Sequence, residues 1–333
     1  MQNLVQDDYG SFLGIERGCI IIKDKYRRAE KFPLQEKEIG EVILKGGNTV
    51  SVDALISLAS WDVDVLIVTE FRKPVAILKS LDSESHVKTR IAQYDALKNG
   101  KGIYIAEQIV KSKIKGQNMV LERYKFEPYE PETTIKSDDL KEARKNFIGV
   151  EGKYGKYYYR CIFKLFPEKI RPKDRRTYKA YEGLNNVFNL SYEILKYKVY
   201  RALIKAKLEP YLGYLHSTQF GKPSLVCDLQ EIYRYLIDDF LIRYCQNLKK
   251  KDFVVKTEVI SKNRTGKRIF LNNSQADKLI ETLNLIFYKQ VEIPRIKMGK
   301  KQSIETLINE EALLLAKYLR GEKKTWVPRV PYL

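Results

Sequence analysis

The chain is a sequence of 333 residues, of which 44% are hydrophobic and 31% are charged, a balance typical of folded globular proteins. At about 100–200 residues per domain, this length predicts two domains. No apolar run approaches the roughly 20 residues that span a bilayer, and the N-terminus lacks the charged and apolar regions of a secretory signal. We therefore expect a cytoplasmic protein without a membrane segment.

The positive charge of the chain is unevenly distributed. Lys and Arg number 61 against 42 Asp and Glu, a net charge of +19. Residues 1–85 contain 11 basic and 14 acidic side chains, a net charge of −3, so residues 86–333 contain 50 and 28, a net charge of +22. Such an excess repels itself unless a polyanion binds it, and nucleic acid is the expected partner. Solubility and attraction to an anionic membrane are the alternatives, but the sequence carries no lipidation signal.

The four cysteines do not indicate a zinc site. Cys19, Cys161, Cys227 and Cys245 are far apart, and none belongs to a C-x-x-C pair. We expect buried thiols in a reducing compartment.

The first 80 residues contain short β-branched runs separated by turn signals. Strands are predicted at residues 19–22, 42–44, 63–68 and 75–78. Residues 51–58 have apolar positions at helical spacing after a plausible cap. The small, polar stretch 80–85 is the predicted linker.

Beyond residue 85 the apolar period becomes that of helices. Amphipathic segments are predicted at 86–125, 138–165, 178–207, 224–247, 274–289 and 303–320. The predicted fold class is therefore α+β, with a small β-rich N-terminal domain, residues 1–85, and a larger all-α domain, residues 86–333.

A carboxylate interrupts the apolar face of the predicted helix at 138–165. Glu151 lies four residues after Phe147 and three before Tyr154, so it points in the direction of the apolar side chains. A charge there is costly unless a cation or several hydrogen bonds satisfy it. A structural salt bridge and a functional site both explain Glu151.

A second group of polar residues surrounds His216, one of only two histidines. His216 lies in a loop-like stretch, where a structural hydrogen-bonding role is the simplest explanation. Pro223 and Ser224 can begin the helix that follows, with Ser224 able to cap it. Asp228 and Glu231 are one turn apart on that helix and point the same way, so they repel each other mildly unless a cation binds both.

Carboxylates combined with an imidazole suit Mn²⁺ or Mg²⁺ better than zinc, which favours more His or Cys. Such an ion can polarise a phosphodiester and lower the pKa of a bound hydroxyl or water, as phosphoryl transfer requires. The residues alone predict a metal site on a basic helical domain, and only the fold can bring the three segments together.

Two neighbouring segments carry a family resemblance. Residues 208–216, LEPYLGYLH, are followed by residues 224–234, SLVCDLQEIYR. Together they resemble the motifs L-[DE]-P-x-L-G-[FY]-L-H and S-L-x-x-D-L-x-E-x-x-R of the CRISPR-associated integrase called CRISPR-associated protein one, which inserts new spacers into CRISPR arrays. Residues 185–195, NNVFNLSYEIL, and the pair Glu151-Gly152 resemble two further motifs of the family, so the likeness is spread over most of the chain.

The resemblance implies that Glu151, His216 and Glu231 bind the metal ion, Mn²⁺ or Mg²⁺, with Asp228 beside them as an auxiliary catalytic acid or a supporting residue. It implies a β-rich N-terminal domain that contributes to dimerisation and a helical catalytic domain. The implied reaction is attack by a 3′-hydroxyl of a short DNA fragment on a phosphodiester at the edge of a CRISPR repeat, with associated endonuclease activity. The implied partners are double-stranded and branched DNA, a second copy of the chain and a small companion adaptation protein.

Four cations near these motifs are candidate DNA contacts. They are Arg160, Lys164, Lys222 and Arg234. Each is equally well explained as a solvated surface charge.

Two other functions fit the same residues. One is a metal-dependent nuclease that uses water in place of the 3′-hydroxyl, and the other is a non-catalytic, basic DNA-binding scaffold whose acids are structural.

The sequence departs from the family pattern, since Asn186 replaces the usual alanine and Lys207 replaces a common glycine.

Overall fold

The computed structural model describes residues 2–6, 8–34, 39–61, 63–69, 74–78, 87–132, 137–178, 180–261, 264–292 and 301–332. The chain divides into two compact units, Met1–Ser85 and His86–Leu333, and the same boundary is predicted from the composition. The predicted linker, residues 80–85, lies outside the described residues.

The N-terminal unit contains two sheets of four strands each within its described residues. In the first sheet, β1 (Gln2–Gln6), β5 (Ile39–Lys45) and β7 (Asp64–Val68) are parallel, and β8 (Pro74–Leu78) runs antiparallel to β7. The second sheet has the order β4 (Ala29–Pro33), β3 (Cys19–Lys23), β2 (Phe12–Glu16) and β6 (Thr49–Val50). The predicted strands correspond to β3, β5, β7 and β8.

One helix, α1 (Val52–Ser60), accompanies these sheets. Its cap is Ser51, whose hydroxyl accepts a hydrogen bond from the N–H of Ala54 at 3.2 Å. The buried side chains of Leu13, Ile20, Val42 and Leu58 belong to one core that joins the helix to both sheets.

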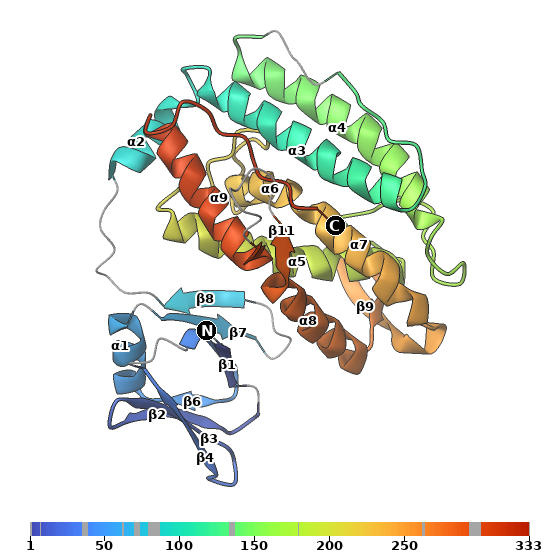
Figure 1. Ribbon diagram of the computed structural model, residues 1–333. Coiled ribbons are helices and arrows are strands. Elements are labelled where there is room, and N and C mark those ends of the chain that lie inside the picture. The colour runs from blue at the N-terminus through green and yellow to red at the C-terminus, as the bar shows by residue number, and fades with distance from the viewer. Residues whose placement is uncertain are drawn as a thin grey trace. The chain divides into compact units, whose positions relative to one another are not determined.

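The C-terminal unit is mainly helical. Its helices are α2 (Val87–Asp95), α3 (Lys101–Arg123), α4 (Leu140–Phe163), α5 (Gly183–Lys205), α6 (Ser224–Glu231), α7 (Arg234–Tyr244), α8 (Asn273–Tyr288) and α9 (Ile304–Leu319), with short 3₁₀ turns at Cys245–Asn247 and Lys250–Asp252. The long helices α3 and α4 run side by side (Figure 1), and α3 also packs against α6 and α7. Figure 1 shows α6, in yellow, beside the middle of α3.

Two segments predicted as continuous helices are interrupted. The predicted segment 86–125 is split at Gly100, which adopts a φ of 77° before α3 begins. The predicted segment 224–247 is split between α6 and α7 at Tyr233. Ser224 is the first residue of α6 and does not cap it, because Pro223 takes the cap position and the Ser224 hydroxyl donates to the carbonyl of Ser217 at 2.9 Å.

The prediction of an all-α second domain is wrong. Strands β9 (Phe253–Ser261) and β10 (Arg264–Leu271) form an antiparallel pair, and β11 (Gln290–Glu292) pairs with β12 (Lys301–Ser303). The first pair begins with Phe253, Val254 and Val255, residue types that favour strands.

Asn186 ties this strand pair to α5. Its amide donates to the carbonyl of Ile269 at 2.7 Å and to the carbonyl of Ala180 at 3.1 Å. Because an alanine at this position could make neither bond, the pair explains the first departure from the family pattern.

The expectation of buried thiols holds for two of the four cysteines. All four are free, with Cys161 and Cys245 buried and Cys19 and Cys227 half-buried.

Among the described residues, no helix is sufficiently long and apolar to cross a membrane.

The C-terminus of α5 explains the second departure from the family pattern, which is Lys207 in place of a common glycine. Lys207 has a φ of 60°, in the left-handed region. Its N–H donates to the carbonyl of Ile204 at 2.9 Å, and the N–H of Leu208 donates to the carbonyl of Leu203 at 3.0 Å. These are the two bonds of a Schellman motif, in which glycine is the usual left-handed residue.

Lys207→Gly is therefore expected to stabilise the protein by about 1 kcal/mol, because it removes the steric cost of a side chain in the left-handed region. Thermal unfolding followed by circular dichroism should show a Tm higher by about 2–4 °C. Ala206→Gly is the matched control, since Ala206 has a φ of −79° and its replacement should lower the Tm. A lower Tm for Lys207→Gly would contradict this explanation.

Candidate active site

The fold brings the three predicted ligands from separate segments to one place. Glu151 lies on α4, Glu231 is the last residue of α6, and His216 lies in the loop before α6. The side chain of Glu231 is 3% exposed, and those of Glu151 and His216 are 20% and 21% exposed. The charges of both glutamates act on His216.

A buried ammonium group lies between the two carboxylates. Lys113, on α3, forms an ion pair with Oε1 of Glu151, and its Nζ lies 2.6 Å from Oε2 of Glu231. Arg234 approaches the other oxygen of Glu231, with Nη1 2.6 Å from Oε1. Each oxygen of Glu231 therefore faces a cation.

These contacts keep the cluster charged. Burial by itself raises the pKa of Glu231, but the charges of Arg234, Lys113 and His216 outweigh it and lower the pKa to about 2. Burial likewise lowers the pKa of Lys113, and the charges of Glu231 and Glu151 raise it above its ordinary value. For both groups, the neighbouring opposite charges favour the ionised form more than burial disfavours it.

Asp228 anchors the loop that carries His216. It is fully buried, and its Oδ2 accepts hydrogen bonds from the N–H groups of Tyr214 and Leu215 at 2.5 and 3.0 Å. Its Oδ1 accepts from the N–H of His216 at 2.9 Å and lies 2.7 Å from the ring Nδ1. Asp228 is thus directed at the loop while Glu231 faces Lys113 and Arg234, so the two acids do not share one cation as the helical spacing suggests.

The hydrogen bond to Asp228 determines which ring atom of His216 is available. With Nδ1 directed at Asp228, Nε2 is the nitrogen that remains for a ligand or a proton. Burial lowers the pKa of His216, but the hydrogen bond and charge of Asp228, followed by the charges of Glu231 and Glu151, raise it above the ordinary value.

A further buried carboxylate, Asp238 on α7, adjoins this cluster. Its Oδ2 accepts a hydrogen bond from the hydroxyl of Tyr158 at 2.9 Å, and its Oδ1 accepts from the hydroxyl of Tyr192. The hydroxyls of Tyr159 and Tyr192 lie 2.9 Å apart. The guanidinium of Arg234 lies 4.5 Å from the ring centre of Tyr192, which connects this network to Glu231.

The four candidate DNA contacts lie in different settings. Arg160 is exposed on α4, and Lys164 is exposed at the C-terminus of that helix. Lys222 is half-buried in the turn before α6. Arg234 pairs with Glu231, so its charge supports the carboxylate cluster.

The sequence interpretation missed Lys113 and Asp238. Lys113 lies four residues after Ile109 and directly before Ile114, on the buried face of α3. A cation on an apolar face is the same signal that draws attention to Glu151, so the pattern could have revealed Lys113. No comparable signal marks Asp238. Its neighbour Asp239 is also buried, so the presence of an acidic residue at this point of α7 does not single out Asp238.

The site contains a protein cation where the metal ion is predicted. Among the described residues, no three His, Cys, Asp or Glu side chains are grouped closely enough to hold a metal ion. The ammonium of Lys113 separates Glu151 from Glu231 in this arrangement.

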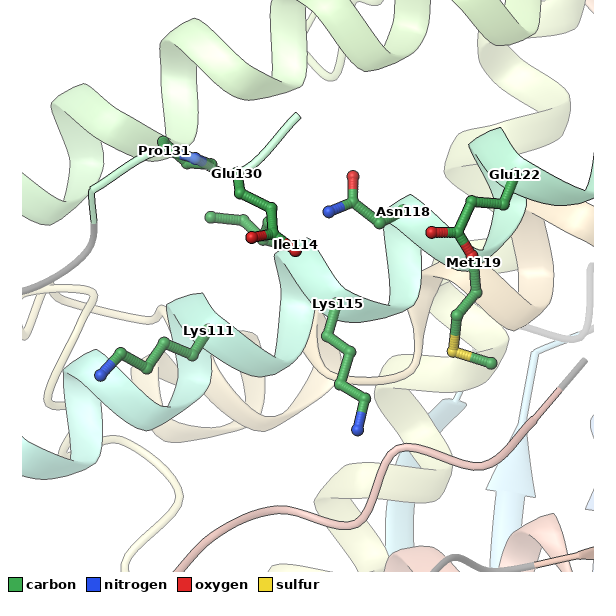
Figure 2. A pocket seen from close by; sticks show the side chains of 8 residues that line it. All are labelled: Lys111, Ile114, Lys115, Asn118, Met119, Glu122, Glu130 and Pro131. Carbon is green, nitrogen blue, oxygen red and sulfur yellow. The ribbon is translucent and has the colours of Figure 1, made fainter. Parts of the chain in front are cut away.

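A separate pocket of about 450 Å³ lies along α3. Figure 2 shows Glu130 and Pro131, from the segment after α3, across from Ile114 and Asn118 of the helix. None of the predicted ligands lines this pocket, and its charged residues are two lysines and two glutamates, Lys111, Lys115, Glu122 and Glu130. It is therefore not part of the carboxylate cluster.

Lys113→Met is expected to lower the free energy of unfolding by about 3 kcal/mol, because it leaves Glu151 and Glu231 close together without the ammonium between them. Adding Glu151→Gln removes one uncompensated charge, so the double variant should be more stable than Lys113→Met alone. Urea unfolding of the wild type, both single variants and the double variant measures this coupling. Additive effects would show that Lys113 and Glu151 do not interact.

The pKa of Asp238 predicts a pH-dependent stability. Burial raises this pKa from 3.8 to about 6, although the hydroxyls of Tyr192 and Tyr158 and the charges of Arg234 and Arg175 act in the opposite direction. Because the folded state holds the proton more tightly, stability from this group falls as the pH rises from about 4 to 6, by about 3 kcal/mol at most.

Asp238→Asn cannot titrate, so its Tm relative to the wild type should rise as the pH increases from about 4 to 7. Melting curves of both proteins across this range measure the difference in Tm. Groups that titrate in the same way in both proteins do not contribute to this difference. A difference that does not change with pH would contradict the raised pKa.

Comparison with known proteins identifies the family. The sequence profile described as CRISPR associated protein Cas1 matches residues 4–276. A relative from Korarchaeum cryptofilum named CRISPR-associated endonuclease Cas1 is 27% identical, and the alignment covers 99% of this chain and 98% of the relative.

Solved structures similar to this chain include the following two. A casposase bound to integration product has a TM-score of 0.74 at 21% identity, over 98% of this chain and 92% of that chain. A chain of a Cas6-RT-Cas1–Cas2 complex has a TM-score of 0.72 at 18% identity, over 98% of this chain and 36% of that chain. The predicted α+β fold class is confirmed, and because the profile match covers most of the sequence, the chain belongs to the Cas1 family of CRISPR-associated proteins.

Proposed function

We propose that this protein is a CRISPR adaptation integrase that transfers DNA strands and has an associated endonuclease activity. The observation that carries the proposal is the convergence of Glu151 and Glu231 on one buried cation beside His216. Membership of the Cas1 family, a relative named as an endonuclease and a similar casposase bound to integration product all support it. The net charge of +22 on residues 86–333 fits a DNA substrate.

The proposed cofactor is Mn²⁺ or Mg²⁺, held by Glu151, His216 and Glu231. The chemistry of the donors fits such an ion, because Glu151 and Glu231 already pair with one cation, the ammonium of Lys113, whose place between the two carboxylates the metal ion would take. Two carboxylates and one imidazole suit a hard or borderline divalent ion. When bound, the ion would polarise the phosphodiester and stabilise the charge that develops on its oxygens.

The residues of the chain prepare this site in two ways. Asp228 holds Nδ1 of His216, which leaves Nε2 to face the ligand. Arg234 holds Oε1 of Glu231 and so fixes the orientation of that carboxylate. Because His216 must lose its proton to bind a metal ion and its pKa is raised, we expect metal affinity to fall as the pH decreases.

The proposed reaction conserves the number of phosphodiester bonds. The 3′-hydroxyl of the incoming fragment loses its proton as its oxygen forms a bond to phosphorus, the bond from phosphorus to the 3′-oxygen of the target strand breaks, and that oxygen takes up a proton. No external energy source is needed. With water as the nucleophile, the same residues would hydrolyse the strand, which accounts for the associated endonuclease activity.

The proposed partners are a second copy of the chain and Cas2. The near-neutral N-terminal unit, with a net charge of −3, fits a role in assembly. Val52 and Ile56 of α1 are 69% and 57% exposed, so this helix presents apolar side chains that a second copy could cover. The similar chain in a Cas6-RT-Cas1–Cas2 complex supports Cas2 as the companion protein.

Strand transfer of a labelled short duplex into repeat-containing DNA tests the proposal. In Mn²⁺ or Mg²⁺ the wild type should give joined product, and EDTA should abolish it. His216→Ala and Glu151→Gln should each reduce the rate by on the order of 100-fold or more while DNA binding is largely retained. Glu193→Gln is the matched control, because Glu193 is an exposed carboxylate on α5.

Other outcomes of this experiment select another function. A wild type that only nicks DNA would favour the nuclease. A wild type that binds DNA but does not react with either ion, with Cas2 present, would favour the non-catalytic DNA-binding scaffold.

A further inference from the structure

Between His216 and α6 the chain makes a tight turn, residues 217–223, called here the 217–223 turn. The N–H of Lys222 donates to the carbonyl of Gln219 at 3.1 Å, and Gly221 adopts a φ of 70°. Phe220 lies at the tip of this turn and is fully exposed, at 109% of its reference area, the highest value among the large hydrophobic residues that the structure describes. Packing within this chain therefore does not explain an aromatic residue at position 220.

Both ends of the 217–223 turn are anchored. On one side, the N–H of His216 donates to the buried carboxylate of Asp228. On the other, the hydroxyl of Ser224 donates to the carbonyl of Ser217 at 2.9 Å. These bonds hold the base of the turn against α6, so the position of Phe220 is tied to that of His216.

The surroundings of Phe220 are polar and basic. Its neighbours in the turn are Ser217, Thr218, Gln219, Gly221 and Lys222. The charges of Lys196, on α5, and Lys222 both act on Cys227 of α6, so both cations lie beside the helix to which the turn is anchored. Lys196 also pairs with Glu193 at 3.1 Å, which leaves Lys222 as the stronger attraction for an anion.

We propose that Phe220 is a stacking platform for an unpaired nucleobase of the DNA substrate, with Lys222 close to the adjoining phosphates. Stacking of bases on exposed aromatic rings, combined with cations for the backbone, is the usual way in which proteins hold single-stranded DNA. This inference rests on the proposed function for the identity of the substrate. It adds a binding subsite beyond the carboxylate cluster.

The chain length limits which nucleotide can reach Phe220. Phe220 is four positions after His216, so the Cα atoms of the two residues lie at most about 14 Å apart. At about 3.4 Å per nucleotide along a strand, the stacked base lies within about four nucleotides of the phosphodiester at the candidate active site. An unpaired base so close to the reacting bond exists in branched DNA but not in a continuous duplex.

A nucleobase fits this position better than a protein partner. An aromatic anchor in a protein interface usually lies among further contacts that exclude water. Phe220 is instead alone among small, polar and basic neighbours, on a unit with a net charge of +22. A single ring beside a lysine matches a base with its phosphate.

The test uses branched DNA that carries 2-aminopurine, a fluorescent analogue of adenine, at one of the first four unpaired positions. Binding to wild-type protein in EDTA, where no reaction proceeds, should quench the fluorescence and should be tighter than binding to a continuous duplex of equal length. Phe220→Ala should weaken binding of the branched DNA on the order of 10-fold, about 1.4 kcal/mol, without changing affinity for the duplex.

Two further variants isolate the stacking contribution. Phe220→Trp should keep the quenching and the preference for branched DNA, and Phe220→Leu, which is apolar but has no aromatic face, should lose both. Tyr26→Ala is the matched control, because Tyr26 is 69% exposed in the N-terminal unit, and it should behave as the wild type does.

Three results would overturn the inference. The first is that Phe220→Ala weakens binding of duplex and branched DNA equally, and the second is that Phe220→Leu quenches the fluorescence as fully as the wild type. The third is that the Phe220 variants change only self-association or Cas2 binding. The last result would make Phe220 a protein anchor. The binding assay does not depend on catalysis. A failure of strand transfer would therefore count against the proposed function, whereas the role of Phe220 is decided by the binding and quenching results.

Discussion

The arrangement of the C-terminal unit depends on burying a small group of opposite charges. Lys113, Glu151, Glu231 and Arg234 come from α3, α4, α6 and α7, and the contacts between them are ion pairs. A buried charge without its partner costs several kcal/mol, so each helix must hold its residue where the others can pair with it. Glu231 ends α6 and Arg234 begins α7, and these two side chains lie 2.6 Å apart across the break between the helices.

Asp228 extends this constraint to a loop that has no regular structure of its own. Its carboxylate satisfies the N–H groups of three successive residues and also orients a ring nitrogen of His216. A loop with several unpaired N–H groups would be unstable when buried. The same four bonds therefore both stabilise the loop and hold His216 in its position, so a change at Asp228 would affect both.

Much of the fold and the site could be predicted because the signals are local. Glu151 interrupts an apolar stripe, the helical period marks α4 and α5, and the motif around His216 resembles a known family. What could not be predicted depends on pairing between distant segments. β4, with mostly exposed side chains, belongs to its sheet through its backbone bonds to β3. The contact of Lys113 with Glu151 joins residues 38 positions apart, and the direction of Asp228 toward the loop follows from N–H groups that helical spacing does not reveal.

In the proposed function, the carboxylate cluster would account for activation of a phosphodiester but not for the choice between cutting and joining. Both reactions need the same charge stabilisation, and they differ only in whether water or a 3′-hydroxyl attacks. That choice depends on holding a DNA end close to the target bond, since a positioned hydroxyl has a far higher effective concentration than a free one. Residues around the cluster must therefore decide the outcome. The 217–223 turn directly follows His216 and is anchored through Asp228 and Ser224 to the helix that ends in Glu231, so its position is coupled to that of His216.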